Sequence, residues 1–198
     1  MTTPPESSTA TEGLRTEHQI ILRVAAVLET LTECFHRGDG FELEGLSQCV
    51  EFLRYFADAC HHTKEEELLF PLLESKGILR EGGPIGVMLY EHQIARRYTL
   101  EMRSALSAVL RKEDGAAEKF IEPARQYVEL IRRHIHKEDT VLFDMGDGVM
   151  DEQDRACYLR GACEADCKLF GGRKREDLVA MAEQIDARWG DRKSSPPS

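Results

Sequence analysis

The sequence predicts an all-α protein: an up-down-up-down four-helix bundle with an additional C-terminal helical segment. Three observations support this fold class. Apolar residues recur at helical spacing through most of the 198-residue chain. No segment alternates apolar and polar residues between turn residues, so we expect no sheet. A histidine motif occurs once on each of the first four predicted helices, and four long helices with short connections favour this bundle.

The first two helices are predicted at residues 12–36 and 43–73. Gly38 and Gly40 follow the first helix, and glycine is frequent just beyond a helix end. Pro71 lies near the end of the second helix, where its missing N–H predicts a kink. The first helix carries a stripe formed by Leu14, His18, Ile21, Val24, Ala25 and Leu28.

The next two helices are predicted at residues 85–112 and 116–143, with a kink at Pro123 in the second of them. A last helical stretch is predicted at 151–188, divided at Gly171-Gly172. We expect this stretch to pack across one end of the bundle. Its apolar seam forms either core or a dimer contact and consists of Leu178, Met181, Ile185 and Trp189.

This pattern divides the chain into four segments. Residues 1–12 and 190–198 are polar and contain proline, so they are predicted to be disordered tails. Residues 13–145 form the bundle domain, and residues 146–189 form a C-terminal helical extension that packs on it.

Composition excludes several classes of function. The formal net charge of −10 would repel a nucleic-acid backbone, so we expect no nucleic-acid partner. No run of 18 apolar residues occurs and the N-terminus is polar, so we expect neither a membrane span nor a secretory signal. A cytoplasmic location with reduced thiols is then the default for the six cysteines.

A histidine pattern occurs twice in the chain. The tetrapeptide Glu-His-Gln-Ile at 17–20 returns at 91–94. Each copy precedes a longer motif, which runs from His61 to Phe70 and from His134 to Phe143. When His61 is aligned with His134, Glu65 meets Glu138 and Phe70 meets Phe143 without a gap. Such a duplication predicts two equivalent halves that face each other across one polar site.

The residue types in this pattern point to metal binding. Residues four apart share one helix face, so His61 and Glu65 reach the same interior, as do His134 and Glu138. His18 and His92 come from the other two helices. Buried imidazoles and carboxylates are costly unless something satisfies them, and two metal ions would do so. This donor set suits iron, manganese or zinc.

A second pair of residues in the first long motif could provide the ligands instead. His62 and Glu66 have the same spacing as His61 and Glu65. The internal repeat favours His61 and Glu65, because the counterpart of His62 is Ile135.

With these motifs the chain resembles the hemerythrin-like, or HHE cation-binding, family over roughly residues 13–145. The resemblance implies a four-helix bundle around an oxo- or hydroxo-bridged centre of two iron ions. The residues implied as ligands are His18, His61, Glu65, His92, His134 and Glu138, with Glu65 and Glu138 bridging the ions.

The chain departs from the oxygen-carrying members of that family at one position. Those proteins have a further histidine four residues after the third-helix ligand, where this chain has Arg96. They also end with His-x-x-x-x-Asp, and Asp139 has that spacing from His134, but the internal repeat favours Glu138. The six-ligand pattern is similar to proteins implicated in iron–sulfur repair, in nitric oxide and peroxide handling, and in sensing. The repair proteins usually add an N-terminal domain with paired cysteines, for which we expect no room here.

Other residues are weaker candidates. His62 and His136 either support the ligands by hydrogen bonds from outside or lie in solvent. Tyr127 is either a core residue or a hydrogen-bond donor to a bound oxygen species. Cys163 and Cys167 share a helix face as a redox pair or soft-metal site, or are small buried apolar residues. Lys64 and Lys137 are most simply solvated.

The predicted function is that of a non-haem di-iron protein that reacts with a small oxidant in stress response or sensing. Its partners are O2, NO or peroxide and a reductant of unknown identity, and a homodimer is a further candidate. Three hypotheses are open: an oxidoreductase that consumes peroxide or NO, a binding or sensor protein, and a non-redox metal store or structural bundle.

Overall fold

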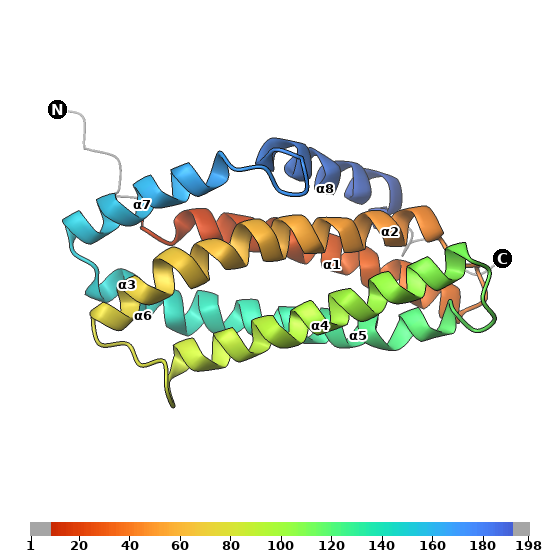
Figure 1. Ribbon diagram of the computed structural model, residues 1–198, viewed down its shortest axis with the longest axis horizontal. Coiled ribbons are helices and arrows are strands. Elements are labelled where there is room, and N and C mark those ends of the chain that lie inside the picture. The colour runs from red at the N-terminus through yellow and green to blue at the C-terminus, as the bar shows by residue number, and fades with distance from the viewer. Residues whose placement is uncertain (1–8, 192–198) are drawn as a thin grey trace.

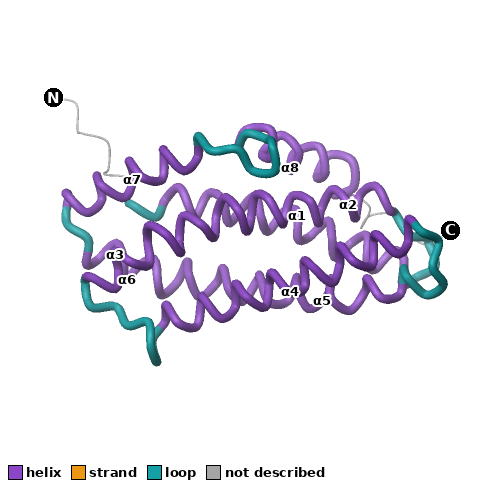
Figure 2. The backbone as a smooth tube through the Cα atoms, in the orientation of Figure 1, coloured by secondary structure: helices purple, strands orange, loops and turns teal. Residues whose placement is uncertain are grey.

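The computed structural model describes residues 9–191, and within this range the chain is helical and has no strand (Figures 1 and 2). The α-helices are α1 (Glu12–His36), α2 (Leu43–Phe52), α3 (Phe70–Ser75), α4 (Pro84–Leu110), α5 (Glu118–Lys137), α6 (Phe143–Val149), α7 (Glu152–Asp166) and α8 (Arg175–Trp189). Three π-helical segments are η1 (Leu53–His62), η2 (Glu65–Leu69) and η3 (Glu138–Leu142). The predicted all-α class is confirmed for this range. None of these helices is long and apolar enough to cross a lipid bilayer.

Two of the long helices contain the π-helical segments. The second runs without a break from α2 through η1 and η2 to α3, and the fourth runs from α5 through η3 to α6. Pro71, where we expected a kink, lies in the first turn of α3, immediately after η2. π-Helical turns are rare and are frequently found at functional sites. Here they coincide with both long histidine motifs, which no propensity pattern predicts.

The predicted end of the fourth helix at residue 143 is wrong, because α6 continues it to Val149. Gly146 lies inside α6 and is buried. A Cβ at this position would come within 3.0 Å of a methyl carbon of Leu73, so the glycine permits close contact with α3. Packing of the two helix ends therefore outweighs the low helix propensity of glycine.

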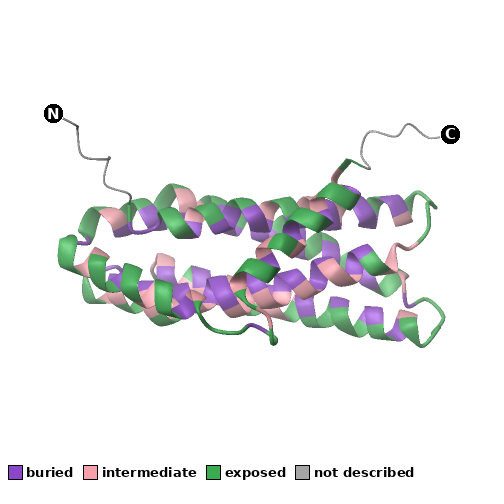
Figure 3. Ribbon diagram, turned by 90° about the horizontal axis from the view of Figure 1, so that it is seen from above, coloured by how far each residue is buried: buried purple, intermediate pink, exposed green. Residues whose placement is uncertain are grey.

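The long helices pack around a common interior. Helix α1 contacts α2, η1 and α5, while α4 contacts α5, α2 and η1. The buried residues lie on the inward-facing sides of the helices (Figure 3). The apolar ones form two clusters. On α1, Leu14 belongs to the smaller cluster and Ile21 to the larger one, and His18 lies between them. The other long helices also change cluster at their histidine motif, so the polar residues form a layer between two apolar regions.

The C-terminal extension lies along the bundle, so the expectation that it packs across one end is wrong. Figure 1 shows α7 and α8 following one another beside α1 and the second helix. Helix α8 contacts α1, α2 and η1, and α7 contacts η2. Leu178, Ile185 and Trp189 are buried and Met181 is half-buried against the larger cluster, so the seam is core of this chain.

The predicted N-terminal tail is partly described. Ala10 and Thr11 are buried, and the Thr11 hydroxyl donates to Asp147 Oδ2 at 2.6 Å. This contact attaches the start of α1 to α6. The rest of the predicted tails, residues 1–8 and 192–198, lies outside the described residues.

Trp189 offers a test of the extension's packing. Its ring is 1% exposed and would lie 3.0 Å from a Cβ at position 45, where the chain has glycine. We expect Trp189→Ala to lower the free energy of unfolding by about 3–5 kcal/mol, because the change leaves a cavity against α1 and α2. Leu169→Ala, at a side chain 64% exposed, is the control and should change it by less than about 0.5 kcal/mol. Guanidinium unfolding followed by far-ultraviolet circular dichroism measures both, and equal effects would contradict this packing.

Candidate metal centre

The six residues that the repeat singled out meet in the polar layer. His18 comes from α1, His61 from η1, His92 from α4 and His134 from α5, while Glu65 and Glu138 begin η2 and η3. Each of these side chains is at most 2% exposed. The duplicated motifs therefore place four imidazoles and two carboxylates in one enclosed site.

One group of donors consists of His18, His61, Glu65 and Glu138, with one ligand atom of each within 4.8 Å of the others. His61 Nε2 lies 3.3 Å from Glu65 Oε1. His18 Nε2 lies 3.3 Å from Glu138 Oε2.

A second group consists of His62, Glu65, His92 and His134, again with ligand atoms within 4.8 Å. His92 Nε2 lies 3.4 Å from Glu65 Oε2, on the side of the carboxylate opposite His61. His134 Nε2 lies 3.2 Å from Glu138 Oε2. Both glutamates thus lie between two sets of imidazoles.

His62 is the residue that the repeat did not predict. Its ring is 2% exposed and stacks on His92 with a centroid distance of 3.8 Å. Neither ring nitrogen has a hydrogen-bond partner among residues 9–191. The expectation of a supporting or solvent-exposed His62 is not what the geometry shows, because the ring is buried among the donors themselves.

The site contains buried oxygens that the protein alone leaves unsatisfied. Within residues 9–191 both oxygens of Glu65 and both of Glu138 make no hydrogen bond. A buried polar group without a partner costs about 1–3 kcal/mol, and a charged one costs more. Cations placed between the imidazole nitrogens and these oxygens would satisfy both, so the donor set fits metal ions.

Each of the four imidazoles from the repeat is held from outside by a carboxylate. In every case Nδ1 is the nitrogen bound, which leaves Nε2 directed to the centre. The pairs are His18 with Asp139 at 2.8 Å, His61 with Glu17 at 2.9 Å, His92 with Glu66 at 2.7 Å and His134 with Glu91 at 3.0 Å. Such partners fix the tautomer and orientation of metal-binding histidines.

Comparison with known proteins agrees with this arrangement. Residues 9–146 match the profile of the Hemerythrin HHE cation binding domain. The chain belongs to the hemerythrin HHE family. Metal binding follows from this membership together with the two donor groups.

Relatives of this HHE protein include an uncharacterized protein of Mycobacterium tuberculosis and one of Mycobacterium bovis. Each is 25% identical over 169 residues, covering 78% of this chain and 66% of the relative, which is slightly less than two thirds of its length. The iron-sulfur cluster repair protein YtfE of Dickeya chrysanthemi is 31% identical over 86 residues, which cover 42% of this chain and 38% of that protein. No solved structure matches the chain.

The internal repeat of the HHE domain extends to the supporting carboxylates. Glu17 and Glu91 occupy the same position of the repeated tetrapeptide, and Glu66 aligns with Asp139 when the two long motifs are superimposed. We did not predict that these four acids support the histidines, although each of them stands beside a predicted ligand in the repeat. Glu66 was considered only as a ligand, in the alternative register with His62. Comparing the two halves position by position would have identified them.

The repeated lysines belong to the site as well. Lys64 is 3% exposed and donates to Glu17 Oε1 at 2.5 Å, so the prediction of a solvated Lys64 is wrong. Lys137 donates to Glu91 in the other half and is half-buried. A positive charge beside each of these acids compensates for moving its carboxylate out of water.

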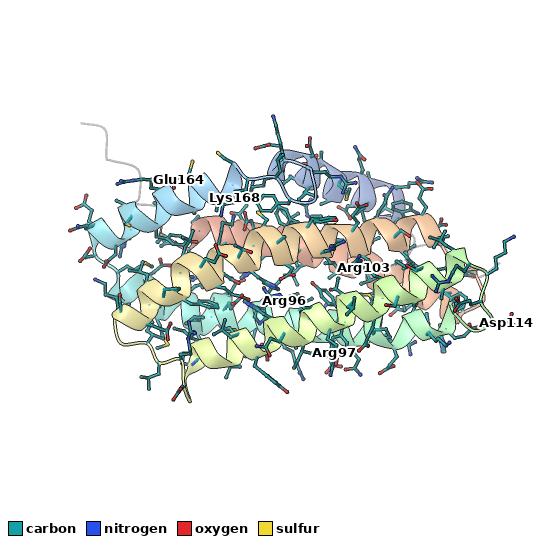
Figure 4. All side chains as sticks on the ribbon, in the orientation of Figure 1. Arg96, Arg97, Arg103, Asp114, Glu164 and Lys168 are labelled. Carbon is teal, nitrogen blue, oxygen red and sulfur yellow. The ribbon has the colours of Figure 1, made fainter. Side chains whose placement is uncertain are left out.

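Arg96 lies on α4 at the position where oxygen-carrying members of the family have a further histidine. It donates to Asp58 at 2.6 Å and to Glu66 at 2.8 Å. Figure 4 shows Arg96 on the side of α4 that faces the second helix, with Arg97 on the opposite side. The residue therefore supports Glu66, the acid that holds His92, and donates no ligand atom itself.

The weaker candidates lie away from the centre. His136 is exposed, while Tyr127 is 1% exposed within the larger apolar cluster, as expected for a core residue. Cys163 and Cys167 are exposed free thiols at the end of α7, so the interpretation as small buried residues is wrong. Their role as a redox pair or soft-metal site stays a prediction.

Two phenylalanines form the apolar wall on the other side of the imidazoles. Phe143 stacks on His18 with a centroid distance of 5.3 Å, and Phe70 stacks on His92 at 6.0 Å. Both rings are completely buried, and they are equivalent in the repeat. They separate the donors from solvent at the end where α3 and α6 lie.

Charges within the metal-free site shift several pKa values. Burial would raise the pKa of Glu17, but the hydrogen bond and charge of His61, together with Lys64, lower it to about 2. Burial would lower the pKa of His61 and of His134, but the charge of Glu65 or Glu138 beside each ring raises it to about 10. Burial and the neighbouring imidazoles hold the pKa of His62 well below its usual range.

These shifts predict how the stability of the metal-free chain depends on pH. The raised pKa values of His61 and His134 stabilise the fold below pH 6.5, and this contribution disappears as pH rises toward 10. The lowered pKa of Glu17 stabilises it above pH 4.5, and this contribution disappears as pH falls toward 2. The lowered pKa of His62 removes stability as pH falls below 6.5. We therefore expect urea midpoints, measured with a chelator, to be highest near pH 6.5.

In a Glu17→Gln variant the urea midpoint should fall less as pH drops from 4.5 toward 2, because the lowered pKa of Glu17 no longer contributes. A midpoint that rises from pH 6.5 to 9.5 in the original chain would contradict the assigned charges.

Proposed function

We propose that this chain is a non-haem di-iron protein that binds and reacts with a small oxidant, O2, NO or peroxide, in a stress response or in sensing. The observation that carries the proposal is the position of Glu65. One of its oxygens faces His61 and the other faces His92, so one carboxylate can bridge two ions. Glu138 also lies between two imidazoles, but Nε2 of His18 and Nε2 of His134 both approach its Oε2.

The proposed ligand set has seven members. In this proposal His18 and His61 hold one ion, and His62, His92 and His134 hold the other. Glu65 belongs to both donor groups and bridges the ions. Glu138 belongs to the first group and would reach the second ion beside His134, which lies 3.2 Å from its Oε2. Imidazole with carboxylate suits iron, and the family membership supports iron over the other metals with the same preferences. The ion beside His18 and His61 receives one imidazole fewer, so a small ligand has more room there.

The surroundings of the site restrict what reaches it. Every proposed ligand is at most 2% exposed, and Phe70 and Phe143 cover one side. Only a small molecule fits such a site without rearrangement of the helices. When bound, a pair of iron ions supplies binding of the small oxidant and electron exchange between ferrous and ferric iron. The protein orients the imidazoles through their Nδ1 atoms and limits access of water.

Two further observations support the proposal. The similarity to an iron-sulfur cluster repair protein links the domain to iron under stress, although the match covers 42% of this chain. The second observation concerns the bundle that holds the site. Helix α1 contacts α2 and α5, and α4 contacts the same two helices, which supports the proposed up-down-up-down order.

The bridging role of the two glutamates is tested by Glu65→Ala and Glu138→Ala. After anaerobic loading with iron(II), we expect about two irons per original chain and at most about one per variant chain, because each change removes a donor from both ions. Glu67→Ala, at an exposed position in the same turn, is the control and should bind iron normally.

Absorption spectra of the loaded chain before and after O2, NO or peroxide separate redox chemistry from storage. New bands that decay under excess oxidant support turnover, and stable bands support binding or sensing. Two irons with no spectral response would contradict the redox proposal in favour of a non-redox metal store or structural bundle.

The role of His62 is tested by His62→Ala. We expect the affinity for one of the two irons to fall at least about tenfold, since the change removes a donor from one group only. His136→Ala removes an exposed imidazole and is the control. Competition with a chelator under anaerobic conditions measures both affinities, and an unchanged His62→Ala variant would exclude His62 as a ligand.

A further inference from the structure

The two halves of the site differ in the environment of their supporting acids. Glu91 receives His134 Nδ1 and Lys137 Nζ, and its side chain is 12% exposed. Glu17 receives the equivalent pair and is 1% exposed. It also receives a third donor, because Arg175 Nε and Nη2 both lie 3.0 Å from Glu17 Oε1. Arg175 is the first residue of α8, so this donor comes from the C-terminal extension.

A second residue of the extension completes the network. Asp166, the last residue of α7, accepts from Lys64 at 2.7 Å and lies 3.5 Å from Arg175 Nε. Two acids and two bases are thus interleaved around the side of His61 that faces away from the centre. Glu17, Cys60 and Asp166 are close enough together to suggest a further metal site. The positive charges of Lys64 and Arg175 already lie against both acids, so a cation there would be repelled.

The loop between α7 and α8 is shaped to bring these residues together. Gly171 and Gly172 have φ angles of 61° and 84°, which favour glycine. A Cβ on Gly171 would lie 2.3 Å from a ring carbon of Tyr55, so only glycine fits against the second helix at this point. The guanidinium of Arg175 lies over the ring of Phe56, 5.8 Å from its centroid. Both sides of the loop are therefore docked on the helix that carries His61.

We propose that the C-terminal extension is part of the metal centre, with Arg175 and Asp166 as positioning residues that act through Glu17 on His61. The inference rests on the proposed di-iron function. Arg175 and Lys64 hold one oxygen of Glu17, and the other oxygen accepts from His61. The orientation of the His61 ring therefore depends on the extension. His134 has no such dependence, because its acid is held by Lys137 of the bundle itself. The extension thus acts on the ion held by His18 and His61 and leaves the other ion unaffected.

Arg175→Ala tests this inference in the full-length chain. We expect the anaerobic affinity for one of the two iron(II) ions to fall about 10–100-fold, while the other keeps its affinity. Arg175→Lys keeps the charge but loses the second N–H donor to Glu17, and it should lose less. Iron per chain at a series of chelator concentrations gives the two affinities separately.

Arg173→Ala is the matched control. Arg173 also ties the extension to the second helix, through Glu51 at 2.5 Å, but no contact joins it to Glu17 in the described structure. It should leave both affinities unchanged, and the melting temperature of each metal-free variant reports general damage to packing. If Arg175→Ala does not fold, Asp166→Asn removes a charge from the same network and should give the same selective loss.

The outcomes separate the two proposals. An original chain that binds no pair of iron ions would contradict the proposed function itself. An original chain that binds two, with unchanged affinities in Arg175→Ala, would overturn only the role of the extension. Equal weakening of both ions, or the same loss in Arg173→Ala, would also overturn it, because either result means that the extension acts through packing alone.

Discussion

The structure depends on two carboxylates buried at the centre of a helical bundle. Glu65 and Glu138 are fully buried and their oxygens have no hydrogen-bond donor in the described chain. Burial of such groups is costly unless cations lie beside them. The layering of the bundle follows from this constraint. Each long helix leaves one apolar cluster, contributes a histidine motif and enters the other cluster. Apolar packing on both sides supplies the stability that a polar layer lacks, and it holds the imidazoles in place.

Around the imidazoles lies a layer of acids, and around the acids lies a layer of bases. Each imidazole of the repeat is held by an acid, and each acid lies beside a base. The acid–base pairs are Glu17 with Lys64, Glu91 with Lys137, Glu66 with Arg96 and Asp139 with Arg15. An acid held in place by a base fixes the orientation of its imidazole ring. The arrangement also accounts for Arg96, because α4 uses this position to hold the acid that supports its own histidine.

The sequence predicts much of this arrangement because the duplication is visible in it. Alignment of the two copies of the histidine pattern identified the six converging side chains, and helical periodicity located the long helices. The sequence offered His62 only as an alternative to His61, and the structure places both in the site for a physical reason. In an α-helix adjacent residues point in well-separated directions, but η1 has i→i+5 turns, which advance each residue less around the axis. His61 and His62 can then both face the interior, while the repeat, with Ile135 opposite His62, argues for only one. The docking of α7 and α8 was also missed, because an apolar seam shows that a helix is buried but not against which surface.

The two halves of the site depart from the internal repeat in different ways, and both departures make the environments of the two ions unequal. His62 adds an imidazole to the group of His92 and His134, where its counterpart in the other half is Ile135. Arg175 and Asp166 reinforce Glu17, and the described structure has no equivalent segment beside Glu91. A strictly duplicated bundle would hold two ions in the same environment. In the proposed centre one ion instead receives three imidazoles, and the other receives two whose support includes a separate helical segment. The ion with fewer protein donors is the one at which a small ligand would bind, so the extension lies behind the half of the site where chemistry is expected.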